Sequence, residues 1–282
     1  MIMGQGLGYS NVKSTYGNAD KKPETAIFPV DAVPLKTLKN VLRGMQGGDL
    51  NITKVDVDGE TYNVGFEPGK IASSSRYISE TYTQTKECRA LFYAGLLHAE
   101  TDEIDVLITG LPVSHYKNEV LRQGLIDMKQ GEYRIGERRT INVKQVRVIS
   151  QPGGGFLNAM SEAMDKGNSK NVNMMNHGCY LVIYPGYFSN DFVVFEEDSL
   201  VQEASDSTLH ATYKIIERAA QRISDSIRHA AGKGLEPYKL ESAIRKKTII
   251  YFQGEEVDIN KEIEVPSKVI CRLTLAVISS CL

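Results

Sequence analysis

Hydrophobic and polar positions change their period several times along the chain, and each change predicts an element. Residues 104–112, IDVLITGLP, are a continuous apolar run that ends at Gly110 and Pro112, which is typical of a strand buried on both faces. Residues 80–99 repeat at helical spacing, and a second helix is expected from about Lys117 to Met128. Strands therefore mix with helices, which favours the α/β class.

The first half also contains turn signals. The Asp58-Gly59 dipeptide lies between alternating apolar residues and predicts a hairpin inside a small inserted subdomain at residues 23–75. A second hairpin is expected to turn near Gly136. One face of the helix at residues 80–99 is apolar, formed by Cys88, Leu91, Phe92, Gly95, Leu96 and Ala99.

The middle of the chain predicts a boundary between two domains. Residues 151–167, QPGGGFLNAMSEAMDKG, are expected to form a strand end, a glycine turn and a short helix that ends at Gly167. Residues 168–177, NSKNVNMMNH, are polar and show no period, as in a linker. The predicted domains are therefore residues 1–167 and 168–282.

The second half repeats the mixture of strands and helices. CYLVIY, the turn PGYFSN and DFVVFEED predict a hairpin over residues 179–198, and a helix with Pro237 in its first turn and a last hairpin, TIIYFQGEEVDI, are expected later. Between them lies a long amphipathic helix whose stripe is expected to pack on a sheet. The stripe comprises Leu209, Tyr213, Ile216, Ala220, Ile223 and Ile227.

Composition narrows the class of protein. The 282 residues are 41% hydrophobic and 24% charged with a formal net charge of −2, so we expect a soluble globular protein without a general nucleic-acid or membrane surface. The four cysteines are far apart, in neither a zinc-site spacing nor a dense disulfide framework. No basic and apolar leader opens the chain, and no window is long enough to span a membrane, so a cytoplasmic location is expected.

Two turns of the chain carry candidate chemistry. Residues 8–11 read Gly-Tyr-Ser-Asn, and residues 186–190 read Gly-Tyr-Phe-Ser-Asn, so the same motif recurs with one inserted residue. Small residues in a turn expose successive backbone N–H groups, which form an anion-binding concavity. Either turn alone is ordinary hairpin chemistry. Their repetition predicts two similar domains, each with a phosphate-binding turn.

Four segments in this order, GLGYSNVKS, ITGLPVSHY, VISQPGGGF and LVIYPGYFSNDFVVF, resemble the plasmid-segregating actin-like proteins of the ParM and StbA group. The resemblance covers residues 2 to about 265. It implies two ribonuclease-H-like domains that face a nucleotide cleft, ATP or GTP with Mg²⁺, and self-association into filaments. It also implies an adaptor protein bound to DNA, and neither direct nucleic-acid binding nor a membrane is expected.

Carried over residue by residue, the resemblance assigns roles. Gln151 matches the residue that orients the attacking water, whereas Lys239 and Glu241 match positions near the ribose. Without the surrounding motifs, Gln151 reads as a hydrogen-bonding residue before a turn and Lys13 as a solvated lysine of a strand. The first phosphate loop would comprise Gly6, Leu7, Gly8, Tyr9, Ser10, Asn11 and Lys13. The second would comprise Pro185, Gly186, Tyr187, Phe188, Ser189 and Asn190, and Asp191 matches a common acidic or polar position just after this loop.

The sequence also departs from the family pattern. Aspartates that manage the metal and water are expected at the positions of Gly6 and Tyr184, and neither is present. Mg²⁺ prefers oxygen ligands, and losing one such group typically costs roughly a hundred- to a thousandfold in rate. We therefore expect nucleotide binding with impaired or lost hydrolysis, and no metal ligand is assigned.

The last residues depart from the pattern as well. Residues 265–282, VPSKVICRLTLAVISSCL, are expected to form the strand that leads to a glycine turn at the adenosine, but no such turn follows. The second domain is therefore expected to be incomplete, whether by a natural end, a truncation or a frameshift. Three functions stay open: an actin-like filament protein for plasmid or DNA segregation, a structural or regulatory pseudo-actin without hydrolysis, and a small-molecule kinase of the same superfamily.

Overall fold

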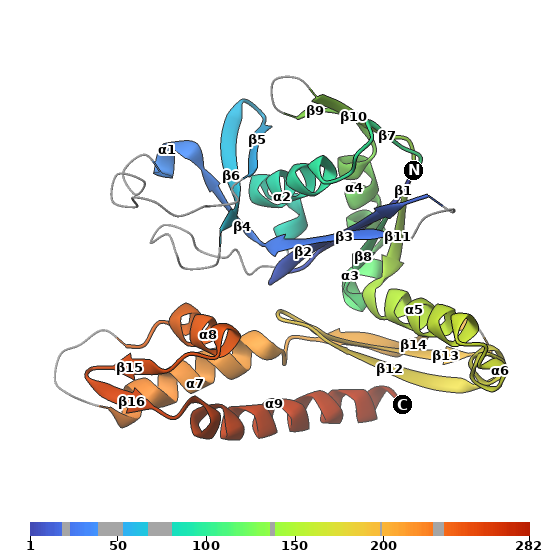
Figure 1. Ribbon diagram of the computed structural model, residues 1–282. Helices are drawn as coiled ribbons and strands as arrows, with labels where there is room; N and C mark the ends of the chain where they lie inside the picture. The colour runs from blue at the N-terminus through green and yellow to red at the C-terminus, as the bar shows by residue number, and fades with distance from the viewer. Residues whose placement is uncertain (19–22, 39–52, 67–80, 136–138, 198, 228–233) are drawn as a thin grey trace. The chain divides into compact units, whose positions relative to one another are not determined.

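The chain folds into two compact units that both mix helices with strands, so the predicted α/β class is confirmed (Figure 1). Unit 1 comprises Met1–Leu111 and His115–Ser150, and unit 2 comprises Pro112–Ser114 and Gln151–Leu282. Both are taken from a computed structural model that describes residues 1–18, 23–38, 53–66, 81–135, 139–197, 199–227 and 234–282.

Unit 1 is built on a five-stranded sheet. Its strands, in spatial order, are Val146–Ser150 (β11), Val106–Leu111 (β8), Ile2–Leu7 (β1), Asn11–Gly17 (β2) and Glu24–Pro29 (β3). Strands β1, β2 and β3 are antiparallel, whereas β8 runs parallel to β1 and β11 runs parallel to β8. Parallel neighbours need crossover connections, and these contain helices Lys86–Leu97 (α2) and Glu119–Lys129 (α4).

Helix α2 carries the predicted apolar stripe except Ala99, which follows the helix, and the whole stripe is buried. The Thr85 hydroxyl accepts a hydrogen bond of 3.1 Å from the Cys88 N–H and caps the first turn. At Gly95 the helix lies so close to β1 that a Cβ atom would be 2.0 Å from Nε2 of Gln5. Any larger residue at position 95 would therefore require the Gln5 side chain to move.

The remaining elements of unit 1 include both predicted hairpins. Asp58 and Gly59 form the first turn and have φ angles of 50° and 77°. The second hairpin pairs β9 with β10, but its expected turn at Gly136 lies outside the described residues, as do residues 39–52 and 67–75 of the expected subdomain. These elements are Asp31–Pro34 (β4), Leu35–Leu38 (α1), Thr53–Val57 (β5), Glu60–Phe66 (β6), Tyr82–Gln84 (η2), Glu103–Ile104 (β7), Gly131–Ile135 (β9) and Arg139–Val143 (β10). A short helix, Val113–Lys117 (α3), begins in Pro112–Ser114.

Unit 2 contains a three-stranded antiparallel sheet, Cys179–Pro185 (β12), Asn190–Glu196 (β13) and Ser199–Thr208 (β14), in that order. The predicted hairpin over residues 179–198 is thereby confirmed. Helix Gln151–Asp165 (α5) packs on β12 and β13, and the rings of Phe156 and Phe195 stack at 4.4 Å.

Two predictions at the start of unit 2 are wrong. The QPGGG segment forms the first turns of α5 instead of a strand end and a glycine turn, because Pro152 suits a first turn and the helix packs on the sheet. Residues 168–177 contain a helix, Ser169–His177 (α6), which is capped by the Asn168 side chain. It buries no residue completely, so its sequence shows no apolar period. The two compact units adjoin in the chain at Ser150 and Gln151.

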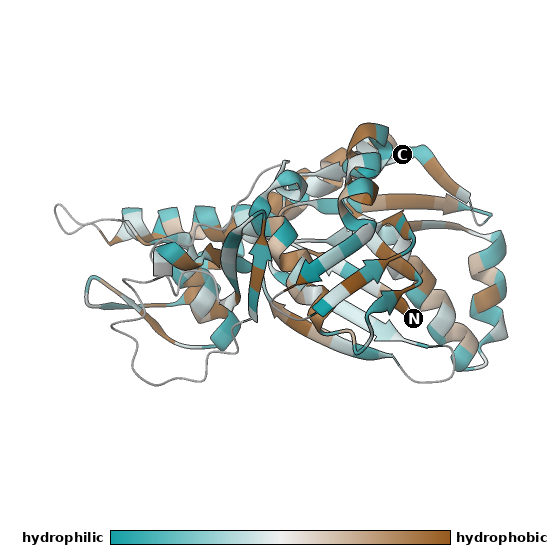
Figure 2. Ribbon diagram, turned by 90° about the horizontal axis from the view of Figure 1, so that it is seen from above, coloured by the Kyte–Doolittle hydropathy of each residue, from teal (hydrophilic) through white to brown (hydrophobic). Residues whose placement is uncertain are grey.

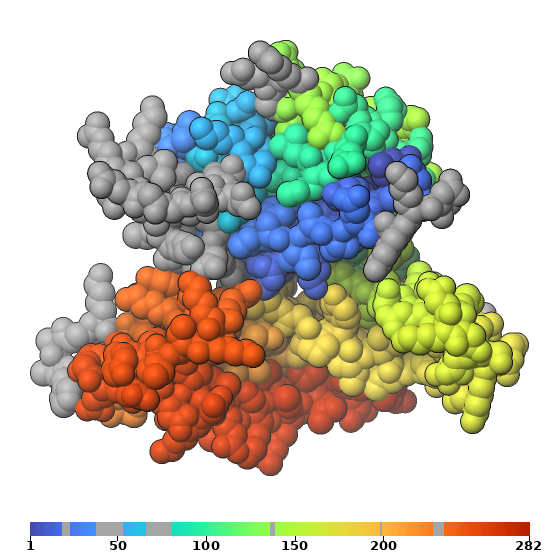
Figure 3. Space-filling view, in the orientation of Figure 1, coloured from blue at the N-terminus to red at the C-terminus, as the bar shows by residue number. Residues whose placement is uncertain are grey.

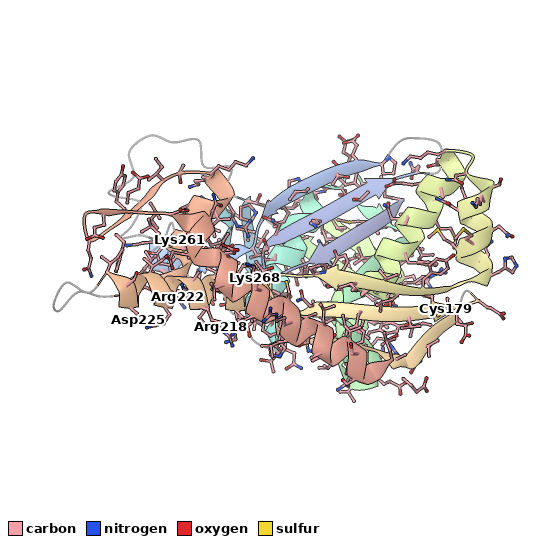
Figure 4. The ribbon with its side chains drawn as sticks, turned by 90° about the horizontal axis from the view of Figure 1, so that it is seen from below. Cys179, Arg218, Arg222, Asp225, Lys261 and Lys268 are labelled. Atoms are coloured by element: carbon pink, nitrogen blue, oxygen red, sulfur yellow. The ribbon has the colours of Figure 1, made fainter. Side chains whose placement is uncertain are left out.

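The rest of unit 2 is mostly helical: Thr212–Ser226 (α7), Pro237–Lys246 (α8) and Ile259–Cys281 (α9), with a hairpin of Ile250–Phe252 (β15) and Glu255–Val257 (β16). The expected helix at Pro237 and the last hairpin are confirmed. Helices α7 and α9 pack side by side, and Figure 4 shows Arg218, Arg222 and Lys268 on their outer sides.

Two further predictions differ from the structure. The stripe of α7 packs on α8, α9 and the β15–β16 hairpin instead of a main sheet, and Leu209 precedes the helix and is 44% exposed. Periodicity identifies an apolar face but not the element that covers it. The expected strand at residues 265–282 lies in α9, where Ile270, Thr274 and Ile278 recur every four residues and are buried. Its outer side, red in Figure 3, is exposed.

Hydropathy follows this architecture: apolar and polar segments alternate along the strands and around the helices (Figure 2). None of the helices in the described ranges is long and apolar enough to cross a membrane.

Candidate functional site

The first candidate turn connects β1 to β2, and an aromatic contact helps to anchor it. Gly8 is closely approached there, since a Cβ would lie 3.1 Å from the carbonyl oxygen of Asn11. The ring of Tyr9 packs at 4.8 Å from the ring of Tyr82. The Asn11 amide donates a 3.3 Å hydrogen bond to the Ser10 hydroxyl. The turn is half-buried throughout, so its small and polar groups lie at the surface of unit 1.

Gly6 and Lys13 face each other across this hairpin. They are direct partners in the register of β1 and β2, and the Lys13 side chain is exposed. A Cβ at Gly6 would meet nothing within 4 Å. The absent aspartate is therefore not excluded by packing, and this strand end has a cation opposite a vacant side-chain position.

The second candidate turn, between β12 and β13, is held by the start of α7. Gly186 donates its N–H to the Ser189 carbonyl at 2.9 Å, and a Cβ at Gly186 would lie 2.4 Å from that oxygen. The carbonyls of Gly186 and Tyr187 accept hydrogen bonds from the backbone N–H groups of Thr212 and Tyr213. The first N–H groups of a helix have no partner within it, so this turn serves as the cap of α7.

Side chains anchor the second turn further. The Phe188 ring stacks on Tyr213 at 5.7 Å. The Tyr187 hydroxyl donates a 2.9 Å hydrogen bond to Oε2 of Glu241, whose other oxygen accepts from Arg245 at 2.8 Å. The structure therefore brings Glu241 to this turn as a buried partner of Tyr187. By contrast, Lys239 is exposed, and in the described part of the chain we find no ion pair for it.

Asp191 is buried and holds several groups of unit 2 together. Its carboxylate accepts hydrogen bonds from the Val113 N–H at 3.0 Å, from the Ser189 hydroxyl at 3.0 Å and from the Ser207 hydroxyl. It is 1% exposed. Its oxygens are therefore used inside the unit, where they fix the turn, β14 and the start of α3.

Tyr184 lies directly opposite Asp191 in the register of β12 and β13. Its ring packs against α5 at Gly155, where a Cβ would be 3.8 Å from the ring. Gln151 is the half-buried first residue of the same helix, one turn away. Tyr184 therefore fills space beside the turn that contains Gln151, where the expected aspartate would be smaller.

A buried lysine lies beneath the first hairpin, and the sequence did not predict it. Lys129, the last residue of α4, is 0% exposed and donates hydrogen bonds to Oγ1 of Thr109 at 2.9 Å and Oε1 of Gln5 at 3.2 Å. Its ammonium group lies 5.2 Å from the ring centre of Phe92. Burial lowers the pKa of Lys129 to about 8 and raises that of the nearby Cys88 thiol to about 11.

In the described residues, the two candidate turns do not present a cluster of metal ligands. Among the residues that the structure describes, no three His, Cys, Asp or Glu side chains gather to hold a metal ion. Gly6 has no side chain, and Asp191 is engaged by neutral donors. The first turn does offer what a phosphate group needs, namely small residues, two polar side chains and the exposed Lys13.

The arrangement of strands and turns belongs to the actin class of folds. The structure is similar to pCBH ParM, solved as a non-polymerisable quadruple mutant, with a TM-score of 0.69 and 21% identity over 95% of this chain and 80% of that one. It is also similar to the archaeal actin homologue Ta0583, with a TM-score of 0.70 and 16% identity over 100% and 82% of the two chains. For the Alp12 filament structure the TM-score is 0.58 and the sequence identity is 13%, over 99% of this chain and 81% of that one.

Residues 6–154 match the N-terminal domain of the actin-like proteins, and the chain belongs to that family. The resemblance to actin-like proteins of the ParM type is thereby confirmed. No curated protein matches the sequence.

Proposed function

We propose that the protein is a nucleotide-binding, self-assembling member of the actin-like family that acts in plasmid or DNA segregation through a DNA-bound adaptor. The observation that carries the proposal is the repeated hairpin, because each unit has a Gly-Tyr and Ser-Asn turn at the end of its first sheet strand. Among the similar proteins, Ta0583 has been solved in complex with ADP and Alp12 as a filament.

In this proposal ATP or GTP is bound through residues 6–13 and 185–191, and the first turn makes the stronger phosphate contact. Ser10, Asn11 and Lys13 lie at the surface of unit 1. In the second turn, the Ser189 hydroxyl donates to Asp191, and the Asn190 amide donates to the His210 carbonyl and to Thr274. Its side chains are therefore already used, and it contributes mainly a rigid backbone.

We further propose that hydrolysis is impaired or lost. Gly6 provides no carboxylate, Tyr184 places a ring against Gly155, and Asp191 is buried among donors. Gln151 remains the candidate for orienting water, since it begins α5 beside the Tyr184 contact. Each missing electrostatic group typically costs roughly a hundred- to a thousandfold in rate.

The test combines melting temperature with phosphate release in the presence of ATP or GTP, with and without Mg²⁺. Stabilisation by nucleotide that Lys13→Ala abolishes, with phosphate release near background, is the expected result. Lys54→Ala is a matched control, because Lys54 is an exposed lysine on another strand of unit 1. Light scattering and pelleting then report nucleotide-dependent assembly. Rapid phosphate release would contradict the impaired hydrolysis, and the absence of any nucleotide effect would contradict the binding.

The alternative is a pseudo-actin that works as a structural or regulatory partner without clamping nucleotide. The internal use of the side chains of Ser189, Asn190 and Asp191 favours it. This alternative predicts unchanged melting temperature and unchanged light scattering at all nucleotide concentrations.

A further inference from the structure

The core of unit 1 contains a positive charge that no acidic side chain of the described residues balances. The ammonium group of Lys129 is fully buried, and the oxygens that accept its hydrogen bonds, on Thr109 and Gln5, are both neutral. Its other close neighbour is the ring of Phe92. The ion pairs among the described residues do not include Lys129. A buried charge normally has an opposite charge beside it, because leaving water is costly.

Acidic side chains of the surrounding elements are engaged at the surface of unit 1. Asp58 forms an ion pair of 2.8 Å with Arg89 of α2. On α4 itself, Asp127 is exposed and accepts a hydrogen bond of 2.7 Å from the Gln123 amide. Surface charges are screened by water and salt, whereas a buried charge is screened much less. The field of Lys129 therefore extends to the nearby surface of unit 1 without an internal acid to cancel it.

The hydrogen bonds of Lys129 lead to the first candidate turn. Gln5 immediately precedes Gly6 in β1, and its direct partner on β2 is Ser14, which immediately follows Lys13. Strand residues advance by about 3.3 Å each, so the turn is roughly 10 Å from the buried ammonium group. The charge therefore lies beneath the end of the hairpin at which phosphate binding is proposed.

The same hydrogen bonds fix the position of this strand end. The Gln5 amide donates a 3.1 Å hydrogen bond to the Phe92 carbonyl of α2. The Gln5 carbonyl accepts a 2.9 Å hydrogen bond from the Thr109 hydroxyl of β8. Lys129 of α4 bonds to both side chains, so α2, α4 and β8 all hold Gln5. A charge held this rigidly does not have to reorganise when a ligand binds.

We propose that an anion bound at the first turn is the counter-charge of Lys129, and that Lys129 is a positioning residue of this anion site. The inference rests on the proposed function, in which the anion at residues 6–13 is the phosphate chain of ATP or GTP. Charges roughly 10 Å apart at an effective dielectric constant of about 20, after screening by salt, change the affinity roughly fivefold. The coupling is reciprocal, so the bound anion also makes Lys129 hold its proton more tightly.

Between pH 7 and pH 9.5, Lys129 is the buried group of this region that loses its charge. Burial lowers its pKa to about 8. The buried Cys88 thiol on α2 has a pKa raised to about 11, and the Tyr133 hydroxyl on β9 has one raised to about 12, so both stay neutral. The other charged or titratable side chains of the elements around Lys129 are not buried: Lys86, Glu87, Arg89 and Tyr93 of α2, Lys13 and Tyr16 of β2, Glu132 and Arg134 of β9, and Arg147 of β11.

Direct titration of Lys129 by NMR tests the coupling. The native chain is prepared with lysine isotope-labelled at Cε, and the Lys129 signal is assigned by its loss in Lys129→Arg, which keeps the charge. The signal is followed against pH without ligand and with saturating pyrophosphate, ATP or GTP, in each case without Mg²⁺. Each bound anion should raise the Lys129 pKa by about 0.7, which is the logarithm of a fivefold change in affinity.

The three ligands separate this inference from the proposed function. If ATP or GTP raises the melting temperature while the Lys129 pKa stays constant, the inference is overturned and nucleotide binding stands. If pyrophosphate raises the Lys129 pKa while neither nucleotide changes the melting temperature, the anion site stands and the nucleotide function is overturned. The absence of a response to all three ligands would overturn both.

Affinity at two pH values separates the charge of Lys129 from its packing. Lys129→Met should weaken ATP or GTP binding about fivefold at pH 7, and by little at pH 9.5, where the native lysine is itself neutral. Lys54→Met is the matched control, because Lys54 is an exposed lysine of β5, and it should keep the native affinity at both pH values. Circular dichroism and melting curves establish that both variants fold. An equal loss at the two pH values would mean that Lys129 acts through packing alone, which would overturn the inference.

Discussion

The hairpins that begin the two main sheets share a turn motif but are stabilised in opposite ways. The β1–β2 hairpin has a turn in which the Tyr9 ring packs on Tyr82, and its strand β1 is paired on both sides. The β12–β13 hairpin has a turn fixed by α7 and α8, beside a strand that is paired on one side within the described residues.

This contrast separates two requirements of a phosphate-binding turn. In the first turn Ser10 and Asn11 are half-buried and hydrogen-bonded to each other, and Lys13 on the following strand is exposed. The second turn uses its polar groups for its own structure, and its sequence is therefore constrained by folding. A shared motif thus does not give the two turns the same chemistry, because the groups available at each copy depend on what the side chains already bind.

Gly186→Ala should break the second turn most severely. A Cβ at this position would lie 2.4 Å from the Ser189 carbonyl oxygen, so the turn and the cap of α7 must shift. We expect a loss of about 3 kcal/mol in the free energy of unfolding, measured by urea denaturation. Gly6→Ala is the control in the first hairpin and should change stability by less than about 0.5 kcal/mol. Similar losses for both variants would remove the proposed difference in anchoring.

Asp191→Asn should cost about 2.5 kcal/mol, because an amide N–H₂ group would face donors that now share a carboxylate. Asp206→Asn, in the same sheet, is a milder control, since Asp206 is less buried. Thermal and urea unfolding of both variants measure the difference. If Asp206→Asn proved as damaging, Asp191 would not be the anchor that we describe.

Lys129, which lies beneath the first hairpin, makes the stability of the folded protein depend on pH. Its folded pKa of about 8 lies below the ordinary 10.5, so the unfolded chain binds the proton more strongly between these values and stability rises with pH. The rise should be about 2 kcal/mol from pH 8 to pH 10. Cys88, whose pKa is raised to about 11, works in the opposite direction above pH 9, because the unfolded thiol ionises first.

The Lys129 effect is therefore measured as a difference. Unfolding free energies of the native chain and of Lys129→Met are compared at each pH, so that the other groups cancel. The free energy of unfolding of the native chain should rise relative to that of Lys129→Met as pH increases. A constant difference across this range would mean that Lys129 keeps an ordinary pKa.

Gly6→Asp should have the smallest effect on stability, within about 0.5 kcal/mol, because its position is open and faces Lys13. Its effect on chemistry is the informative one: nucleotide-dependent stabilisation should become sensitive to Mg²⁺. Gly6→Asn, which has the same shape without the charge, is the control. Equal responses of the two variants to Mg²⁺ would contradict the role given to the missing carboxylate.

The sequence predicts local features well where one rule determines the outcome. The Asp58-Gly59 turn has two positive φ angles, and a Cβ at Gly186 would lie 2.4 Å from the Ser189 carbonyl oxygen. Prediction from the sequence fails where packing against distant elements determines the secondary structure. The QPGGG segment becomes helical against the sheet, and the apolar run of residues 265–282 forms a helix on α7.

The candidate site shows the same division. The repeated motif identifies both turns, but it does not predict the hydrogen bonds that Asp191 and Lys129 make. In the sequence Lys129 looks like a common lysine in the last turn of a helix. Its burial depends on Gln5 and Thr109, which are distant in the sequence and accept its hydrogen bonds in the folded unit. Val113 likewise donates its backbone N–H to Asp191, and a backbone contact of this kind has no signal in the sequence.

The pairing of β1 with β8 has a consequence for synthesis. The Thr109 hydroxyl donates to the Gln5 carbonyl across 104 residues of chain, so translation takes about 5–20 s to supply β8 after β1. During that interval the β1–β2–β3 meander can form on the ribosome with one side of β1 still open. Nascent unit 1 therefore passes through a stage in which β1 presents an unpaired backbone edge, and this edge is covered only when β8 has been synthesised.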